Sequence, residues 1–246
     1  MKALITGASS GIGKELALRL ADQGYDLILI ARRKERLASI KDACSHVHVD
    51  IFPVDLTDFS QVDELINQLK DIPIDLFINN AGYGTIDHSI KIDTDKELDM
   101  IDLNIKSLHK LTKFAIHHMD KGKIVNLASM AAYLPTPKMA SYAATKAYVS
   151  MYSQALNYEL KKLGKNIQVV TVSPGPVKTE FADVAGVKQK MKGMPVEKCV
   201  RIILKELKKN KSLIIPGFQM KFLKFIIRFV PKKLLLYSAN KFQSKK

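Results

Sequence analysis

Two residues with complementary chemistry lie four positions apart in the chain, Tyr142 and Lys146. Residues at i and i+4 share one face of a helix, so the phenol and the ammonium are predicted to point to the same place. A phenol has a pKa of about 10 and is a poor acid–base catalyst at neutral pH. A neighbouring ammonium favours the phenolate and lowers that pKa. The pair can therefore move a proton to or from a substrate oxygen, although many helices carry this spacing on an exposed face.

Polar or turn-forming residues follow three predicted strands, at 74–79, 123–128 and 167–173. These residues are Asn80, Ala81 and Gly82 after the first strand, Ser129 after the second, and Pro174 and Gly175 after the third. Each also has an ordinary structural interpretation as a loop cap or a turn. Because open α/β sheets bind ligands at the carboxyl ends of their strands, we expect them to gather at one edge with the Tyr–Lys pair.

A glycine-rich turn joins the first predicted strand, residues 2–6, to the first predicted helix, residues 11–23. In such a turn Gly7 allows the chain to reverse tightly, and Gly11 lets the backbone approach a pyrophosphate. Gly13 lets the helix pack closely on the sheet, and the helix N-terminus offers free N–H groups to an anion. The alternative is a turn without a ligand, but its place at the first strand–helix junction favours a dinucleotide.

The end of the second predicted strand, residues 26–31, distinguishes two cofactors. Enzymes that use NAD commonly place an acid there for the ribose 2′-hydroxyl, whereas an arginine accommodates a 2′-phosphate. This chain has Arg32 and Arg33 and no acid at that position. Guanidinium groups bind phosphate through paired hydrogen bonds, so the pattern predicts NADP(H). Either arginine alone could instead be a solvated charge at the strand end.

The rest of the pattern alternates short apolar runs with longer amphipathic ones. Strands are predicted at 2–6, 26–31, 47–54, 74–79, 123–128, 167–173 and 212–215. Helices are predicted at 11–23, 33–43, 58–70, 94–119, 139–163 and 195–209. This alternation indicates βαβ units and a parallel sheet covered on both faces. The Gly-, Pro- and Lys-rich loop 174–194 is the best candidate for a mobile segment.

Taken together, the spacings T-G-x-x-x-G-x-G and Tyr-x-x-x-Lys in this context resemble the short-chain dehydrogenase/reductase family over residues 1 to about 215. The resemblance implies a single α/β domain at 1–215 with a Rossmann-like, doubly wound parallel sheet of about seven strands. It also implies an oxidoreductase that passes a hydride between NADP(H) and a carbonyl or alcohol substrate, and a homodimer or homotetramer. A regulator that binds NADP without turnover is the alternative, against which the complete set of polar residues argues.

The resemblance also assigns roles to single residues. Tyr142 exchanges a proton with the substrate oxygen, Ser129 hydrogen-bonds that oxygen, and Lys146 lowers the Tyr142 pKa and holds the nicotinamide ribose. Asn104 kinks its helix and holds a water that links Lys146 to solvent. The implied cofactor contacts are Gly7, Ser9, Ser10, Gly11, Ile12, Gly13, Arg32, Arg33, Asp55, Leu56, Asn80, Ala81, Gly82, Tyr142, Lys146, Pro174, Gly175, Val177 and Thr179. Among these, Asp55 is expected at the adenine amine.

The basic charge of the chain is confined to its last quarter. Residues 187–246 hold 17 Lys/Arg and two acids, so they carry the whole net charge of +15. Within the predicted extension 216–246, residues 219–230 read as a helix whose polar stripe is Lys221, Lys224 and Arg228. Such a basic amphipathic helix can lie on an anionic membrane surface. Alternatively, its apolar face covers the substrate pocket or contacts another subunit.

Several other classes of protein and site are disfavoured. We expect no secretion signal, since the N-terminus lacks a long apolar run, and no run approaches the roughly 18 apolar residues of a spanning helix. Cys44 and Cys199 form no C-x-x-C motif and are expected to be free thiols in a reducing cytoplasm. No histidine set has metal-ligand spacing, and large apolar residues interrupt the basic tail, so neither metal nor nucleic acid is expected. We therefore expect a cytoplasmic protein, which the basic tail could attach to the inner face of the membrane.

Overall fold

Continuous apolar strands need cover on both faces, and helices inserted between parallel strands provide it. The computed structural model describes residues 1–185 and 193–243. Seven strands form one sheet in the order β3-β2-β1-β4-β5-β6-β9, with neighbouring strands parallel. They are β1 (Lys2–Thr6), β2 (Asp26–Ala31), β3 (Val49–Pro53), β4 (Leu76–Asn79), β5 (Lys121–Leu127), β6 (Asn166–Val172) and β9 (Leu213–Ile214). The predicted seven-stranded, Rossmann-like parallel sheet is therefore confirmed.

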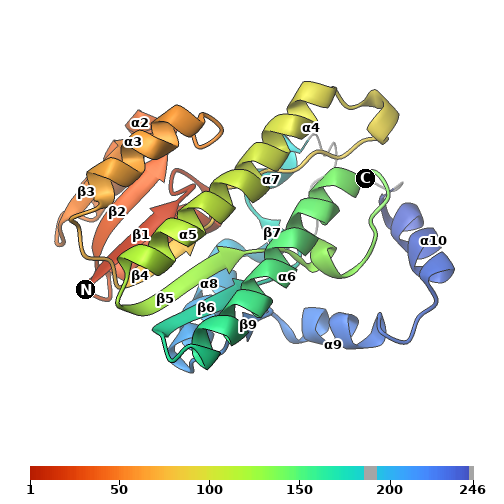
Figure 1. The fold of residues 1–246 in the computed structure, drawn as a ribbon. Helices are drawn as coiled ribbons and strands as arrows, with labels where there is room; N and C mark the ends of the chain where they lie inside the picture. The colour runs from red at the N-terminus through yellow and green to blue at the C-terminus, as the bar shows by residue number, and fades with distance from the viewer. Residues whose placement is uncertain (186–192, 244–246) are drawn as a thin grey trace.

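Helices pack on both faces of this sheet (Figure 1). One face is covered by α1 (Gly11–Ala21), α2 (Lys34–Ala43) and α8 (Val196–Lys208). The other is covered by α3 (Phe59–Leu69), α5 (Leu108–His118) and α6 (Ala140–Lys162). Strand order reverses between β1 and β4, which is where sheets of this kind place their ligand crevice.

Alternation along each strand divides the apolar core into these two layers. In β1, Ala3 and Ile5 face the α1 side, while Leu4 faces the α3 side. Leu29 and Ile30 divide in the same way in β2. All five side chains are fully buried. A strand that is apolar on both faces is thus explained by its central position in a three-layer structure.

The single helix predicted at 94–119 is interrupted. α4 (Thr94–Ile101) is followed by a π-helix at Asp102–Ser107 and then by α5. A π-helix holds one more residue per turn than an α-helix, and such bulges are frequent at functional sites. The apolar period continues through the segment, so the sequence pattern alone does not show the wider turn.

The segment predicted as mobile, 174–194, contains regular structure at both of its described ends. β7 (Val177–Lys178) pairs in parallel with β8 (Met194–Pro195), and α7 (Phe181–Val184) lies between them in the chain. Residues 186–192 lie outside the described residues, so the prediction of mobility is not tested there. The β7–β8 pair holds the start of this segment beside the first turn of α8.

A buried polar network joins the centre of the sheet to its helices. Asn79 Nδ2 donates to Asn126 Oδ1 at 2.9 Å and to Thr112 Oγ1 at 3.0 Å, and Asn126 Nδ2 donates to Ser153 Oγ at 2.9 Å. Buried amides are costly unless they are hydrogen-bonded. The network therefore favours one alignment of α5 and α6 over β4 and β5, and α6 is the helix that carries Tyr142 and Lys146.

The basic extension forms α9 (Phe218–Ile226) and α10 (Lys232–Gln243), which lie outside the layers of the sheet domain (Figure 1). α9 ends four residues earlier than predicted, and Pro231 precedes α10. Along one side α9 contacts the body: Met220 lies against Gly175, and Lys224 Nζ lies 4.5 Å from the centre of the Tyr133 ring. None of the helices in the described part of the chain could cross a bilayer, being too short or too polar.

Candidate active site

The glycine turn after β1 takes the shape that its sequence predicts. Gly7 and Gly11 have φ angles of 65° and 54°, a left-handed region in which a side chain is strained. A Cβ atom on Gly13 would overlap the Gly7 carbonyl oxygen and lie 2.5 Å from Asn80 Nδ2. The missing side chains therefore bring the start of α1, and its free N–H groups, against the end of β1.

The end of β4 is fastened to the same turn. The main-chain N–H groups of Asn80 and Ala81 both donate to Thr6 Oγ1 at 3.0 Å. Asn80 Nδ2 donates to the carbonyl oxygens of Thr6 at 3.0 Å and Gly7 at 3.2 Å. Asn80 thus acts as a brace between two strand ends, a role that the sequence alone left unspecified.

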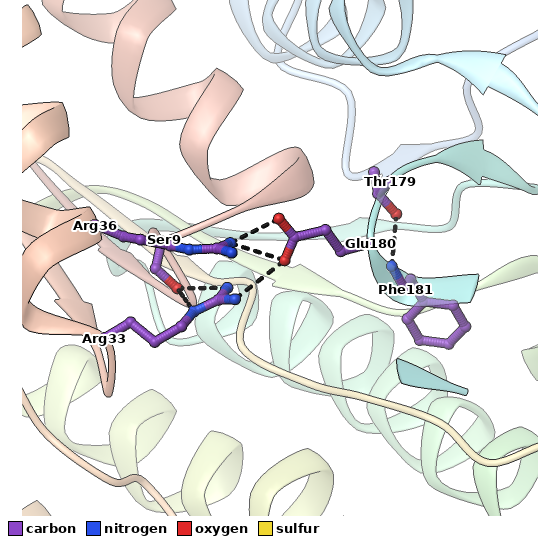
Figure 2. A network of polar contacts seen from close by, with 6 residues as sticks. All are labelled: Ser9, Arg33, Arg36, Thr179, Glu180 and Phe181. Atoms are coloured by element: carbon purple, nitrogen blue, oxygen red, sulfur yellow. Dashed lines mark hydrogen bonds and ion pairs between the residues drawn. The ribbon is translucent and has the colours of Figure 1, made fainter. Parts of the chain in front are cut away.

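The two predicted arginines have different surroundings. Arg33 Nε and Nη2 donate to Ser9 Oγ at 3.2 and 3.0 Å, and Arg33 Nη1 lies 3.1 Å from Glu180 Oε2 (Figure 2). The Arg32 side chain is 70% exposed, and its Nη1 lies 3.7 Å from Asp55 Oδ2. Arg33 is therefore held at the glycine turn, whereas Arg32 lies at the adjacent surface beside the predicted adenine-binding aspartate.

A third arginine was missed by the sequence reasoning. Arg36 Nη1 donates to both carboxylate oxygens of Glu180, at 2.6 and 2.9 Å (Figure 2). Its position three residues after Arg33, one turn along α2, is a signal that could have found it. An open pocket of about 250 Å³ lies at this place and is lined by Ser9, Ser10, Gly11, Lys14, Arg36, Ser39, Ile40 and Glu180.

Asp55 and Leu56, which follow β3, lie across the sheet edge from the glycine turn. Asp55 Oδ1 accepts hydrogen bonds from the N–H of Thr57 at 3.0 Å and from its hydroxyl at 2.9 Å. The carbonyl of Leu56 accepts from the hydroxyl of Ser107, in the π-helix. The predicted adenine-binding loop is thus fixed locally and connected to the helix segment that contains Asn104.

The catalytic candidates come together at the carboxyl edge of the sheet. Tyr142 and Lys146 lie on α6 and are both buried, and the lysine Nζ lies 5.9 Å from the centre of the phenol ring. Lys146 Nζ donates to the carbonyl oxygen of Leu127, the last residue of β5, at 2.9 Å. Ser129, two residues further on, hydrogen-bonds Tyr142 through its side chain and also accepts from the N–H of Ala131 at 3.1 Å.

Burial controls the acidity of both groups. It raises the pKa of Tyr142 to about 12, and the hydrogen bond with Ser129 opposes this rise. Burial also lowers the pKa of Lys146 to about 8, because the charged ammonium is poorly solvated there. The sequence predicted that Lys146 would lower the Tyr142 pKa. In the protein by itself burial is the largest cause and the net pKa of Tyr142 is raised, so the contribution of Lys146 stays a prediction.

Asn104 lies in the π-helix and is fully buried beside this pair. Its Nδ2 donates to the carbonyl of Tyr83 at 2.9 Å and to Thr145 Oγ1 at 3.0 Å, while its Oδ1 accepts from the Tyr83 N–H at 3.2 Å. A Cβ atom on Gly82 would lie 2.7 Å from Asn104 Oδ1 and 3.2 Å from Lys146 Nζ. The missing side chain of Gly82 thus allows the loop after β4 to approach the amide and the amine closely.

Three further predicted positions, Pro174, Val177 and Thr179, lie on the segment that follows β6. The carbonyl of Pro174 accepts from the Met130 N–H at 2.9 Å, and Val177 lies in the β7–β8 pair. Thr179 contacts Gly11, where a Cβ atom would lie 3.2 Å from the threonine side chain. The sequence analysis did not identify Phe181, whose ring centre lies 5.4 Å from the ring centre of Tyr142. Segment 174–181 therefore runs from the end of β6 past the glycine turn to the Tyr142 phenol.

No group of three or more His, Cys, Asp or Glu side chains among residues 1–185 and 193–243 could hold a metal ion. Cys44 and Cys199 are buried free thiols, and burial raises the pKa of each. Reactive cysteines generally show the opposite shift. The groups that the structure brings together at this edge are the Tyr142 phenol, the Ser129 hydroxyl, the Lys146 ammonium and the glycine turn.

Comparisons with known proteins agree with this geometry. The family model described as short chain dehydrogenase matches residues 1–190. An uncharacterised short-chain type dehydrogenase/reductase of Sinorhizobium fredii is 36% identical over 197 residues, which are 77% of this chain and 76% of the relative. A short-chain dehydrogenase from Sphingobium yanoikuyae, solved in complex with NADPH, is 33% identical with a TM-score of 0.83, covering 88% of each chain. A bulky-bulky ketone specific alcohol dehydrogenase from Comamonas testosteroni is 30% identical with a TM-score of 0.79, covering 88% of this chain and 86% of its own.

The depressed pKa of Lys146 makes stability depend on pH. Between its folded value of about 8 and its unfolded value of 10.5, the unfolded chain binds more protons, so the free energy of unfolding rises with pH. We expect Lys146→Met to remove a slope of up to about 1.4 kcal/mol per pH unit from urea titrations between pH 8 and 10. Lys161→Met, at an exposed site on the same helix, should keep the parent slope. Equal slopes in the parent and Lys146→Met would contradict the assignment.

Proposed function

The chain belongs to the short-chain dehydrogenase family, and we propose that it uses NADP(H) to interconvert a carbonyl and a secondary alcohol. The observation that carries this proposal is the meeting of Tyr142, Ser129 and Lys146 at the carboxyl edge of the sheet, a short distance from an anion-binding glycine turn. A phenol and a hydroxyl that hydrogen-bond each other can both reach one substrate oxygen. The oxidoreductase class follows from the family.

The residues at the site fit nicotinamide adenine dinucleotide phosphate, NADP(H). The glycine turn would receive the pyrophosphate, and Arg33 and Arg36 converge on one carboxylate, a geometry equally suited to a phosphate. Gly82, Asn104 and Lys146 border the place expected for the nicotinamide ribose. When bound, the cofactor supplies or accepts the hydride. The NADPH complex of the Sphingobium relative supports this choice over NAD.

The proposed proton transfer runs through three side chains. Tyr142 Oη gives its proton to the substrate oxygen during reduction, and Ser129 holds that oxygen in place by hydrogen bonding. A phenol whose pKa is raised to about 12 retains its proton at neutral pH, so the enzyme is ready in the reducing direction. For oxidation the phenolate needs added positive charge, which Lys146 and a bound oxidised cofactor would provide. Phe181, packed on the phenol ring, limits the access of water to it.

Asn104 connects this site to the wider turn of the π-helix. Its amide binds the main chain of Tyr83 and the Thr145 hydroxyl, so it holds the loop after β4 against α6. We propose that a water beside Asn104 passes protons between Lys146 and solvent. Asn104 lies within the π-helix and is buried there, and π-helical turns are frequent at functional sites.

The proposed substrate is a lipophilic ketone or alcohol. The Comamonas relative, whose description specifies bulky ketones, supports a ketone class. Next to the phenol lie apolar side chains from several elements: Ile86, Met100, Ala131, Met139 and Phe181. An apolar wall of this kind binds hydrocarbon groups on either side of a carbonyl, while the phenol and Ser129 recognise the oxygen.

We also propose that the protein forms a homodimer or homotetramer, as is common in the family.

We further propose that α9 and α10 attach the protein to an anionic membrane surface. Phe218, Phe222, Phe225 and Phe229 are between 55% and 81% exposed, which is unusual for four aromatic rings on one short segment. Stacked and edge-on ring contacts arrange them in two pairs, Phe218 with Phe222 and Phe225 with Phe229. The lysines and the arginine between them carry the charge that anionic lipid attracts. Apolar substrates dissolved in the bilayer would then be near the site.

Tyr142→Phe should lower kcat for ketone reduction by about 10²–10⁴-fold, because general acid catalysis contributes this much and the ring contact with Phe181 is kept. The measurement is NADPH oxidation with a panel of bulky ketones. Tyr158→Phe, at a 63% exposed site on the same helix, should match the parent. Equal activity in Tyr142→Phe would exclude the phenol as the acid, and an NADPH-binding parent that reduces no carbonyl would favour a regulator.

Arg33→Ala should raise the KM for NADPH about tenfold while leaving the KM for NADH within twofold, since only the 2′-phosphate loses its paired hydrogen bonds. Steady-state kinetics with each cofactor make the comparison. Arg201→Ala removes an exposed guanidinium on α8 and serves as the control for net charge. A parallel rise for both cofactors would point to a structural role for Arg33.

Changing Phe218, Phe222, Phe225 and Phe229 together to serine in the full chain should reduce cosedimentation with anionic vesicles about tenfold at low salt, because the buried apolar area is lost. Raising the salt should weaken the parent as well, by screening the lysines. The control replaces Ile90 and Met151, which are 95% and 77% exposed, with serine. A parent that stays in the supernatant at low salt would refute membrane attachment.

A further inference from the structure

Three consecutive residues after β7 contact separate parts of the site, and Figure 2 shows them with the two arginines that Glu180 binds. Thr179 contacts Gly11 in the phosphate-binding turn. The Glu180 carboxylate binds Arg33 and Arg36. The Phe181 ring packs on Tyr142. Because the three residues are consecutive, a shift of one of them would also move its neighbours and affect their contacts.

Glu180 occupies the donors that a 2′-phosphate needs. Its carboxylate receives two hydrogen bonds from Arg36, at 2.6 and 2.9 Å, and one from Arg33, at 3.1 Å. These bonds lower the pKa of Glu180, with Arg36 the larger cause, so the carboxylate is charged at neutral pH. Carboxylate and phosphate oxygens prefer the same forked arrangement of guanidinium N–H groups. The two anions also repel each other, so they compete for this place.

The existing contact is weak enough to be displaced. The side chains of Glu180, Arg33 and Arg36 are 45%, 43% and 47% exposed. Exposed ion pairs contribute little net stability, because water solvates the separated charges well. A phosphate carries more charge and more acceptor oxygens than a carboxylate. Arg33 also stays anchored through Ser9, so it remains in position when its partner changes.

We propose that Glu180 is an internal competitor for the 2′-phosphate, released from Arg33 and Arg36 when NADP(H) binds, and that its release shifts Phe181 over Tyr142. The inference rests on the proposed NADP(H) dependence and adds a residue that sets both cofactor selectivity and the cover of the phenol. While it binds the two arginines, Glu180 lowers the affinity for NADP(H). When the 2′-phosphate displaces it, segment 179–181 moves and Phe181 changes its position beside Tyr142.

The route from Glu180 to the phenol is short. Glu180 precedes α7, and the hydroxyl of Thr179 accepts from the Phe181 N–H at 3.3 Å, which makes the three residues one compact turn. Gly84 gives the turn little free space, since a Cβ atom there would lie 2.8 Å from the Tyr142 ring and 2.9 Å from that of Phe181. A movement of the Glu180 backbone would therefore displace the Phe181 ring against that of Tyr142.

Direct binding measurements on the full chain test the competition without turnover. The probes are 2′,5′-ADP, 5′-ADP, NADPH and NADH, titrated by calorimetry against the parent and Glu180→Gln. We expect Glu180→Gln to bind 2′,5′-ADP and NADPH about fivefold more tightly, and 5′-ADP and NADH within twofold of the parent. Glu35→Gln is the matched control, since it removes an equal charge from an exposed site on α2. It should leave all four affinities unchanged.

A single tryptophan tests the coupling, because the chain contains none. The indole emission of Phe181→Trp should change when 2′,5′-ADP binds, and the same change should be present in ligand-free Phe181→Trp/Glu180→Gln. Unchanged emission on 2′,5′-ADP binding would overturn the coupling. The competition would be overturned if Glu180→Gln bound 2′,5′-ADP no more tightly than the parent does, or if Glu35→Gln gained as much affinity. In either case, a parent that binds NADPH more tightly than NADH would uphold the proposed function. A parent without that preference would overturn both.

Discussion

The arrangement of the site depends on one interaction, the hydrogen bond from the buried ammonium of Lys146 to the end of β5. An amine removed from water is costly unless polar groups receive its hydrogen bonds, and here the carbonyl at the end of β5 does so. That bond ties α6 to the sheet edge and brings Tyr142 beside Ser129, which follows the same strand. Gly82 is required opposite the amine, because a side chain there would meet both Lys146 and Asn104. One poorly solvated charge thus orders a helix, a strand end and a loop.

A second set of charges lies at the opposite end of the site. Arg33 and Arg36 meet Glu180 at the surface, where water screens their interaction, so this contact is exchangeable in a way that the Lys146 contact is not. In the proposed function, the buried polar groups give a rigid base for proton transfer, while the exposed ion pairs could be replaced by an anion. Segment 179–181 contacts both, and the proposed release of Glu180 would relate the choice of cofactor to the surroundings of the phenol.

Much of the fold was predictable because its signals are local. Strands that are apolar on both faces, such as 26–31, and helices bounded by glycine or polar caps led to the correct sheet and layers. The interruption at Asp102–Ser107 was not predictable, since Leu103 and Leu108 continue the apolar pattern across it. Likewise, the basic helix was expected to reach residue 230, yet α9 ends at Ile226, where the chain turns toward Pro231. In both places the backbone conformation depends on contacts or turns that the spacing of the apolar residues does not reveal.

By itself, the sequence determined which chemical groups are present and which strand ends carry them, because side-chain periodicity and glycine positions reflect local geometry. It placed the Tyr–Lys pair, Ser129 and the glycine turn in one family and at one sheet edge. Only the tertiary structure decided that burial raises the pKa of Tyr142, that Arg36 joins Arg33, and that Glu180 stands between them. Solvation and contacts between residues more than a hundred positions apart depend on how the whole chain packs, and no short-range pattern encodes them.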